Sequence, residues 1–214
     1  VNSMKWQDLL TLVGSEPVFS STFLMAGNQS RVDIQLQLSR WVKAGKLYQL
    51  KRGLYVLAEL YRKVSPHPFL LANRIRNASY VSLQSALAWY DLIPEYVPVV
   101  TSVTTTRTNA FHTHEGVFLY RHIKIPLFNG YGSVELQDRQ AAFLALPEKA
   151  LLDLIYLTPH SESWEYLREL RLQNMDRIDT ALLMELSKKS GSPRLELAAN
   201  RIVQLVHEEE YSEI

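Results

Sequence analysis

The sequence contains no cysteine. This absence excludes disulfides, thiolate nucleophiles and metal sites held by cysteine, and it is typical of proteins from a reducing compartment. The chain also lacks any run of about 18 consecutive apolar residues, the length that suggests a membrane-spanning helix. Its first residues do not show the charged-then-apolar pattern of a signal peptide. We therefore expect a cytoplasmic protein with no membrane association.

Common catalytic signatures are missing as well. The sequence has no GxxxxGK[ST] loop, GxGxxG turn, GxSxG elbow or HExxH pair. Their absence argues against the commonest nucleotide-binding, dinucleotide-binding, serine-hydrolase and zinc-protease folds. We expect a protein that is not an enzyme and needs no cofactor or metal.

The net charge of +1 is the sum of two parts of opposite sign. Residues 1–63 hold nine Lys and Arg against four Asp and Glu, a net charge of +5, whereas residues 64–214 hold 14 against 18, a net charge of −4. The basic excess is concentrated between Arg31 and Arg52, where only Asp33 opposes it. Clustering of this kind attracts a polyanion.

Three helices are predicted in the first 45 residues. Apolar spacing predicts a helix over residues 5–13, a short apolar helix over 23–26, and a longer helix from Ser30 to Ala44. Gly27 supplies the bend between the second and third helices. The third helix has an apolar stripe at helical spacing, formed by Ile34, Leu38, Trp41 and Val42.

A hairpin is predicted directly after the third helix. The β-prone runs 47–50 and 54–57 are separated by Lys51-Arg52-Gly53, a turn sequence. Helix, short helix, basic helix and hairpin in this order are typical of a winged helix-turn-helix, in which the third helix enters the major groove and the hairpin lies against phosphates. We therefore predict a DNA-binding domain over residues 4–63. Its predicted contacts with double-stranded DNA are Gln29, Ser30, Arg31, Arg40, Lys43, Lys46, Lys51 and Arg52.

The fold class predicted for the whole chain is α+β. Prolines in residues 64–68 favour an extended linker. Residues 69–214 are predicted to form a mixed α/β second domain that is helical from about residue 147. Its expected helices cover 69–75, 81–93, 148–157, 163–174, 180–190 and 193–209, and its expected strands lie within 97–146.

Several other groups allow alternative functions. His112, His114 and Glu115 alternate in a pattern that suits either a metal site or a solvated loop. The aromatic residues Trp41, Tyr48, Tyr55 and Trp89 are candidates for stacking on bases, although such spacing is more typical of a core. Arg74 and Arg76 either extend the phosphate-contacting surface or belong to an ordinary exposed helix face. An acid-and-lysine set of the kind that holds Mg²⁺ in nucleases is also present, although such sets arise by chance: Glu135, Asp138, Glu148 and Lys149.

Two functions besides DNA binding therefore remain open at the level of sequence. The chain could be a protein-interaction module whose winged helix does not bind DNA. It could also be a metal-dependent nuclease, which is the weaker alternative because its residue set is unspecific.

Four segments, in their order along the chain, resemble the AbiEi-type antitoxins, the transcriptional regulators of abortive-infection (type IV) toxin–antitoxin systems. The segments are LSRWVKAGKLYQLKRGLYVL (38–57), SYVSLQSALAWYDLIP (79–94), VVTSVTTTR (99–107) and LPEKALLDLIYL (146–157). The similarity covers roughly residues 20–157.

The resemblance implies a repressor of its own operon and an antidote in phage defence. A winged helix-turn-helix would bind inverted repeats in the promoter, as a homodimer on DNA, and the second domain would counteract a nucleotidyltransferase toxin without needing a stable complex with it. The matched helix places Gln29, Ser30, Arg31, Arg40 and Lys43 toward DNA, and the matched hairpin places Lys51 and Arg52 there.

Overall fold

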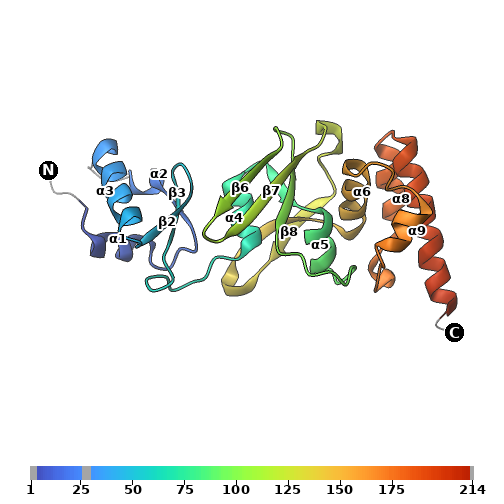
Figure 1. Cartoon of the computed structure of the whole chain (residues 1–214), viewed down its shortest axis with the longest axis horizontal. Coiled ribbons are helices and arrows are strands. Elements are labelled where there is room, and N and C mark those ends of the chain that lie inside the picture. The colour runs from blue at the N-terminus through green and yellow to red at the C-terminus, as the bar shows by residue number, and fades with distance from the viewer. Residues whose placement is uncertain (1–3, 26–29, 213–214) are drawn as a thin grey trace.

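Three parts follow one another along the long axis of the molecule: a small N-terminal part, a central sheet and a bundle of C-terminal helices (Figure 1). The computed structural model describes residues 4–25 and 30–212, with side chains described as far as residue 209. These residues form a mixed arrangement of helices and two sheets. The predicted α+β class is therefore confirmed.

The N-terminal part consists of three helices and a small antiparallel sheet with strand order β1-β3-β2. Ser30 begins the third helix as expected, because its hydroxyl accepts a hydrogen bond from the Asp33 backbone N–H at 3.2 Å. The expected bend at Gly27 lies outside the described residues. The elements are α1 (Trp6–Val13), β1 (Phe19–Ser20), α2 (Ser21–Leu24), α3 (Arg31–Lys43), β2 (Leu47–Lys51) and β3 (Leu54–Leu57).

The β2–β3 hairpin is covered on both of its faces. Leu47 and Leu57 pack into a core with helices α1 and α3, whereas Leu50, Leu54 and Val56 belong to the core of the rest of the chain. All four residues of β3 are therefore buried. The N-terminal part is thus packed against the central part through its sheet.

The central part is built on a six-stranded mixed sheet with strand order β6-β7-β5-β4-β9-β8. The pairs β4/β9 and β5/β7 are parallel, and the other neighbours are antiparallel. Its elements are α4 (Pro68–Ile75), β4 (Ser79–Val81), α5 (Leu83–Trp89), β5 (Val100–Thr104), β6 (Asn109–Thr113), β7 (Gly116–His122), β8 (Tyr131–Glu135) and β9 (Ala141–Ala145), with short 3-10 turns at Ile125–Leu127 and Gln137–Arg139.

Strand β4 corrects the expectation of a helix from residue 81. Tyr80 and Val81 are fully buried because β4 lies inside the sheet between β5 and β9. A three-residue strand buried on both faces has no alternation by which its sequence could be distinguished from a helix. The helix begins only at Leu83, whose φ of +53° marks an abrupt turn out of the strand.

The segment 64–68 is held against the central part by a buried glutamine. Gln140 is 6% exposed, and its amide donates to the Ser65 carbonyl at 2.9 Å while its oxygen accepts from the His67 N–H at 2.8 Å. His67 has the extended backbone that the prolines favour, Pro68 already begins α4, and the two hydrogen bonds fix the segment in place.

The C-terminal part is helical from Pro147 onward. Its elements are α6 (Pro147–Leu157), α7 (Trp164–Glu169), a 3-10 turn at Met175–Arg177, α8 (Thr180–Lys189) and α9 (Pro193–Ser212). The helix expected over 163–174 is shorter, because Arg171 and Asn174 adopt left-handed backbone conformations that end it. Along the described ranges, no helix combines the length and apolar character needed to cross a membrane.

Candidate nucleic-acid interface

Helix α3 is anchored by one side and exposes the other. Ile34, Leu38 and Trp41 are buried in the N-terminal core, and their spacing places all three on one side of the helix. Val32 is 72% exposed and Leu36 is 51% exposed on the opposite side. We call the side centred on Val32 and Leu36 the outward face of α3.

The cations predicted on α3 are accessible. Arg31, Arg40 and Lys43 are all exposed. Helical spacing places Arg40 and Lys43 on the outward face, and it places Arg31 toward the flank of the helix. Arg40 donates a weak hydrogen bond to the Gln37 side chain at 3.4 Å.

Ser30, unlike these cations, has a structural role in the helix. The Ser30 hydroxyl donates to the Asp33 carboxylate at 2.8 Å in addition to accepting from the Asp33 N–H. Its hydrogen-bonding capacity is therefore used to cap α3. Gln29 lies outside the described residues.

The outward face also contains two polar residues that the sequence prediction omitted. Gln35 and Ser39 are exposed, and they lie beside Leu36 and Lys43 by helical spacing. The signal that could have found them is the buried stripe itself, because residues that lie opposite Ile34, Leu38 and Trp41 must face solvent.

The hairpin turn exposes one of its two predicted cations. Arg52 is exposed in the turn between β2 and β3. The Lys51 ammonium instead donates to the Ile75 carbonyl at the end of α4, at 2.6 Å. Burial and the neighbouring Arg76 and Arg74 charges lower the pKa of Lys51. Lys51 therefore helps to hold the hairpin against the central part.

Lys46 also has a structural contact. Its ammonium lies 5.0 Å from the centre of the Trp6 ring, and the side chain is half-buried. Trp6 in turn packs edge-on against Trp41 and Tyr61. This cation–π contact connects the start of β2 to α1.

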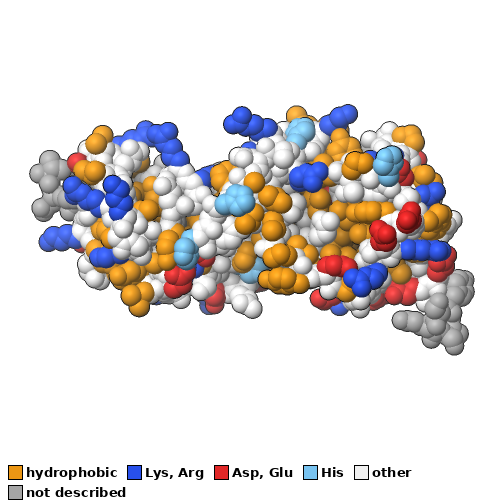
Figure 2. Space-filling view, in the orientation of Figure 1, with side chains coloured by type: hydrophobic (Ala, Val, Ile, Leu, Met, Phe, Trp, Pro, Cys, Tyr) orange, Lys and Arg blue, Asp and Glu red, His pale blue; other side chains and the backbone are white. Residues whose placement is uncertain are grey.

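Ion pairs are more frequent among the cations of the C-terminal helices than among those of α3 and the hairpin turn. Within the described residues, Arg31, Arg40, Lys43 and Arg52 form no ion pair, whereas four cations near or within the C-terminal helices do. Those pairs are Arg171–Glu95, Arg177–Asp91, Lys189–Glu185 and Arg194–Glu162. Figure 2 shows Lys and Arg side chains over the N-terminal part, and Asp and Glu side chains gathered mostly over the C-terminal helices.

A cluster at the joint between the N-terminal part and the sheet resolves the metal hypothesis for His112, His114 and Glu115. The structure groups His114 and Glu115 with Glu59, and His112 is not part of the group. The Arg62 guanidinium donates to Glu115 at 2.8 and 3.2 Å and to Glu59 at 2.8 Å. Because the Arg62 guanidinium already occupies oxygens of both carboxylates, the cluster is better described as an ion-paired joint than as a metal site.

An aromatic contact strengthens this joint. The His114 ring stacks on Tyr48 of β2, with ring centres 3.6 Å apart and planes inclined by 10°. The turn between β6 and β7 therefore contacts the hairpin through His114 and the segment that follows the hairpin through Glu115.

The acid-and-lysine set does not assemble. Glu148 is buried and accepts a hydrogen bond from the Asp179 N–H at 2.7 Å, whereas Glu135 and Asp138 are exposed on β8 and on the turn that follows it. Across residues 4–25 and 30–209, the cluster at the joint is the one group of acids and histidines close enough to hold a metal ion.

Lys149 instead belongs to a buried polar network on α6. Its ammonium donates to the Asp153 carboxylate, which also accepts from the hydroxyls of Tyr80 at 3.0 Å and Ser82 at 2.8 Å. Burial raises the pKa of Asp153, while the Lys149 charge and the hydrogen bonds act in the opposite direction. A charge this deeply buried is tolerated only with such partners.

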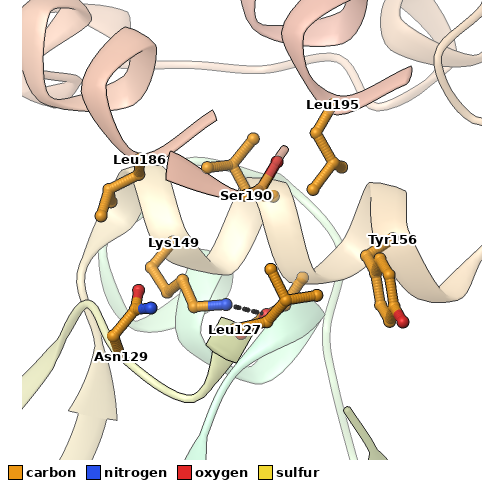
Figure 3. Close-up of a pocket in the computed structure, with 9 residues that line it drawn as sticks. Leu127, Asn129, Lys149, Tyr156, Leu186, Ser190 and Leu195 are labelled. Carbon is orange, nitrogen blue, oxygen red and sulfur yellow. Dashed lines mark hydrogen bonds and ion pairs between the residues drawn. The ribbon is translucent and has the colours of Figure 1, made fainter. Parts of the chain in front are cut away.

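The cavity beside this network is too small for a substrate. Figure 3 shows Lys149 and Tyr156 beneath Leu186, Ser190 and Leu195, with the Lys149 ammonium in an ion pair. The cavity has a volume of about 20 Å³, enough for one water molecule. The contacts of this network therefore serve to stabilise the fold.

No model of a known protein family matches this chain, and a comparison with curated proteins finds no significant match. A functional assignment therefore rests on the geometry above and on the sequence motifs.

Proposed function

We propose that this chain is a DNA-binding transcriptional repressor of the AbiEi type, with a winged helix-turn-helix over residues 4–63. In this proposal α3 is the recognition helix and the β2–β3 hairpin is the wing. The observation that supports it most strongly is a group of exposed cations on α3 and the hairpin turn that form no ion pair in the described chain, Arg31, Arg40, Lys43 and Arg52. Exposed charges of one sign that lack partners within the molecule favour a polyanionic partner.

The residues of this interface would have different roles. Arg40, Lys43 and Arg52 would contact phosphates, which position the protein without reading sequence. Gln35 and Ser39 are suited to hydrogen-bond base edges, and the exposed methyl groups of Val32 and Leu36 to contact thymine methyls. We retain Gln29 as a proposed base contact because it immediately precedes Ser30, the N-cap of this helix.

Salt dependence of promoter binding tests the proposal. Three phosphate contacts predict that log K falls against log salt with a slope of about −3, using about −0.9 per neutralised phosphate. The measurement is a titration of the full chain with the duplex upstream of its gene, at several salt concentrations. A slope near zero, or no binding to this duplex or to unrelated duplexes, would contradict a DNA-binding role.

We also propose that the protein counteracts a nucleotidyltransferase toxin, on the basis of the sequence resemblance. Growth of cells that express the adjacent toxin gene, with and without this chain, tests this role. A double variant with Arg40→Ala and Lys43→Ala should still rescue growth if neutralisation belongs to the second domain. Rescue by neither the wild type nor the variant would remove the antitoxin role and leave the repressor role to the salt titration.

Inverted repeats would require two protomers on one operator. Sedimentation of the protein with a duplex that contains both half-sites should therefore give two chains per duplex.

Capture of a stable protein partner, together with failure to shift promoter DNA, would instead favour a protein-interaction module.

A further inference from the structure

A pocket of about 320 Å³ lies where the segment that follows the N-terminal part meets the central sheet. Its walls include His67 and Phe69 at the start of α4, Trp89 at the end of α5, Tyr96 in the loop before β5, and Glu115 in the turn between β6 and β7. Its volume falls within the range of about 300–1,000 Å³ typical of small-ligand sites. We call it the aromatic pocket.

Aromatic rings distinguish this pocket. Two other pockets of similar volume, about 310 and 340 Å³, each have a single aromatic ring in the walls, from Phe143 and Tyr61 respectively. In the aromatic pocket, Trp89 packs edge-on against His67 with ring centres 5.9 Å apart, and it is tilted against Phe69 at 5.5 Å. The neighbouring rings therefore support Trp89 within the wall.

Two of the rings remain open to solvent. Trp89 is 40% exposed and Tyr96 is 89% exposed. Grouped apolar surface of this kind is costly to hydrate and commonly marks a binding site. The flat faces of aromatic rings stack on planar ligand groups of many kinds.

His67 supplies a ring N–H to the pocket, and the wall contains one carboxylate, which is ion-paired. The His67 Nδ1 atom accepts the Phe69 N–H at 3.1 Å, so the neutral ring has its proton on Nε2. Burial lowers the pKa of His67, which keeps the ring neutral. The one carboxylate in the wall, Glu115, forms an ion pair with Arg62.

We propose that the aromatic pocket binds an uncharged planar heteroaromatic ring of the nucleobase type, stacked on Trp89 and Tyr96 and accepting a hydrogen bond from His67 Nε2. A charged ligand would find no unneutralised counter-charge in the wall, which disfavours phosphates and ammonium groups. A free nucleoside and an unpaired base of a single strand share the required chemistry.

The position of the pocket connects it to the N-terminal part. Glu115 lines the pocket and pairs with Arg62, and the adjacent His114 stacks on Tyr48 of the hairpin. A ligand that displaces this turn would alter the contacts that hold β2. This consequence for DNA affinity rests on the proposed function, whereas ring binding itself does not.

Calorimetric titration of the full chain with adenosine, guanosine, cytidine, uridine and a short single-stranded oligonucleotide tests the proposal. We expect saturable binding with one ligand site per chain. Tyr96→Ala and Trp89→Leu should each weaken it by about 5- to 100-fold, the range that stacking on one aromatic residue supports. Phe143→Ala removes another exposed ring, 47% exposed and outside the pocket, and should leave affinity unchanged.

The possible results separate the ligand sources and the two proposals. Binding of a nucleoside that is lost in the pocket variants identifies a free ligand, and the same loss with the oligonucleotide alone identifies an unpaired base. Absence of saturable binding with all five probes, or an equal loss in Phe143→Ala, overturns the proposal. Promoter binding is measured separately, so failure to bind duplex removes the repressor role without changing the calorimetric result. Because Tyr96 is almost fully exposed, its variant should fold like the wild type, which urea denaturation will check.

Discussion

The N-terminal part and the C-terminal helices differ in how many of their cations form ion pairs. Around α3, cations are exposed and lack acidic partners in the described chain, whereas five of the eight cations of residues 147–214 pair with carboxylates on the surface or, in the case of Lys149, inside the core. Residues 147–214 contain 13 acidic against eight basic residues. Charge that is satisfied internally contributes to the fold, while unsatisfied charge of one sign remains available to a partner.

The largest effect should come from breaking the buried pair. Asp153→Ala leaves the Lys149 ammonium buried without a counter-charge and removes the acceptor of Tyr80 and Ser82. We expect a loss of about 3–5 kcal/mol in the free energy of unfolding, measured by urea denaturation. Asp176→Ala, at an exposed acid in the same region, should change stability by less than about 0.5 kcal/mol. Equal effects of the two substitutions would show that the network does not stabilise the fold.

The N-terminal part should show the reverse behaviour. Arg40→Ala with Lys43→Ala should weaken binding to all duplexes by about ten-fold or more and reduce the salt slope by about 2, because two phosphate contacts are lost. Stability should change little, since both side chains are exposed. Lys188→Ala, an exposed cation at the end of α8, is the matched control and should leave the affinity unchanged. A similar loss in the control would mean that general charge, and not this face, determines affinity.

A pH experiment sharpens the contrast within the C-terminal part. Burial raises the pKa of Glu148 above its ordinary value of 4.5. The stability that this group contributes is therefore fully present below pH 4.5 and is lost as the pH rises through the folded-state pKa. Glu148→Gln removes this dependence, so the variant should gain stability relative to the wild type as the pH increases from about 4.5.

Urea denaturation between pH 4 and 8 measures this difference. Glu165→Gln is the control, because Glu165 occupies the first turn of α7 but is exposed. If the pH profile of Glu148→Gln runs parallel to that of the wild type, the buried carboxyl does not titrate in this interval.

The smallest effect concerns the two basic residues that border β2. Lys46→Ala removes the contact with Trp6 and should reduce stability by about 0.5–1 kcal/mol with little change in DNA affinity. Arg52→Ala, in the exposed hairpin turn, should weaken DNA binding with little change in stability. Paired urea and promoter titrations compare them. Equal losses of DNA affinity in the two variants would indicate that Lys46 also contacts DNA.

Local periodicity predicted much of the N-terminal part. The stripe of Ile34, Leu38 and Trp41 indicated α3, and turn residues indicated the hairpin, because both signals depend on neighbours in sequence. The separate status of Lys46 and Lys51 was not predictable in this way. Their partners, Trp6 and Ile75, are distant along the chain and become neighbours only in the folded protein.

The aromatic pocket was also not predictable from local sequence patterns. Trp89 was a candidate for stacking on sequence grounds. Its partners His67 and Phe69, however, lie at the start of another helix, α4. The buried strand β4 was missed for a related reason, since three residues covered on both faces show no period.

The sequence by itself determined the amphipathic helices, the hairpin and the concentration of positive charge before residue 64, because spacing and composition act over short distances. Only the tertiary structure decided which charges are neutralised. It paired Lys149 with Asp153 inside the core, joined Arg62 to Glu115 across the joint, and left Arg40, Lys43 and Arg52 without an acidic partner in the described chain. The physical reason is that burial and pairing depend on which distant segments meet, and no local pattern contains that information.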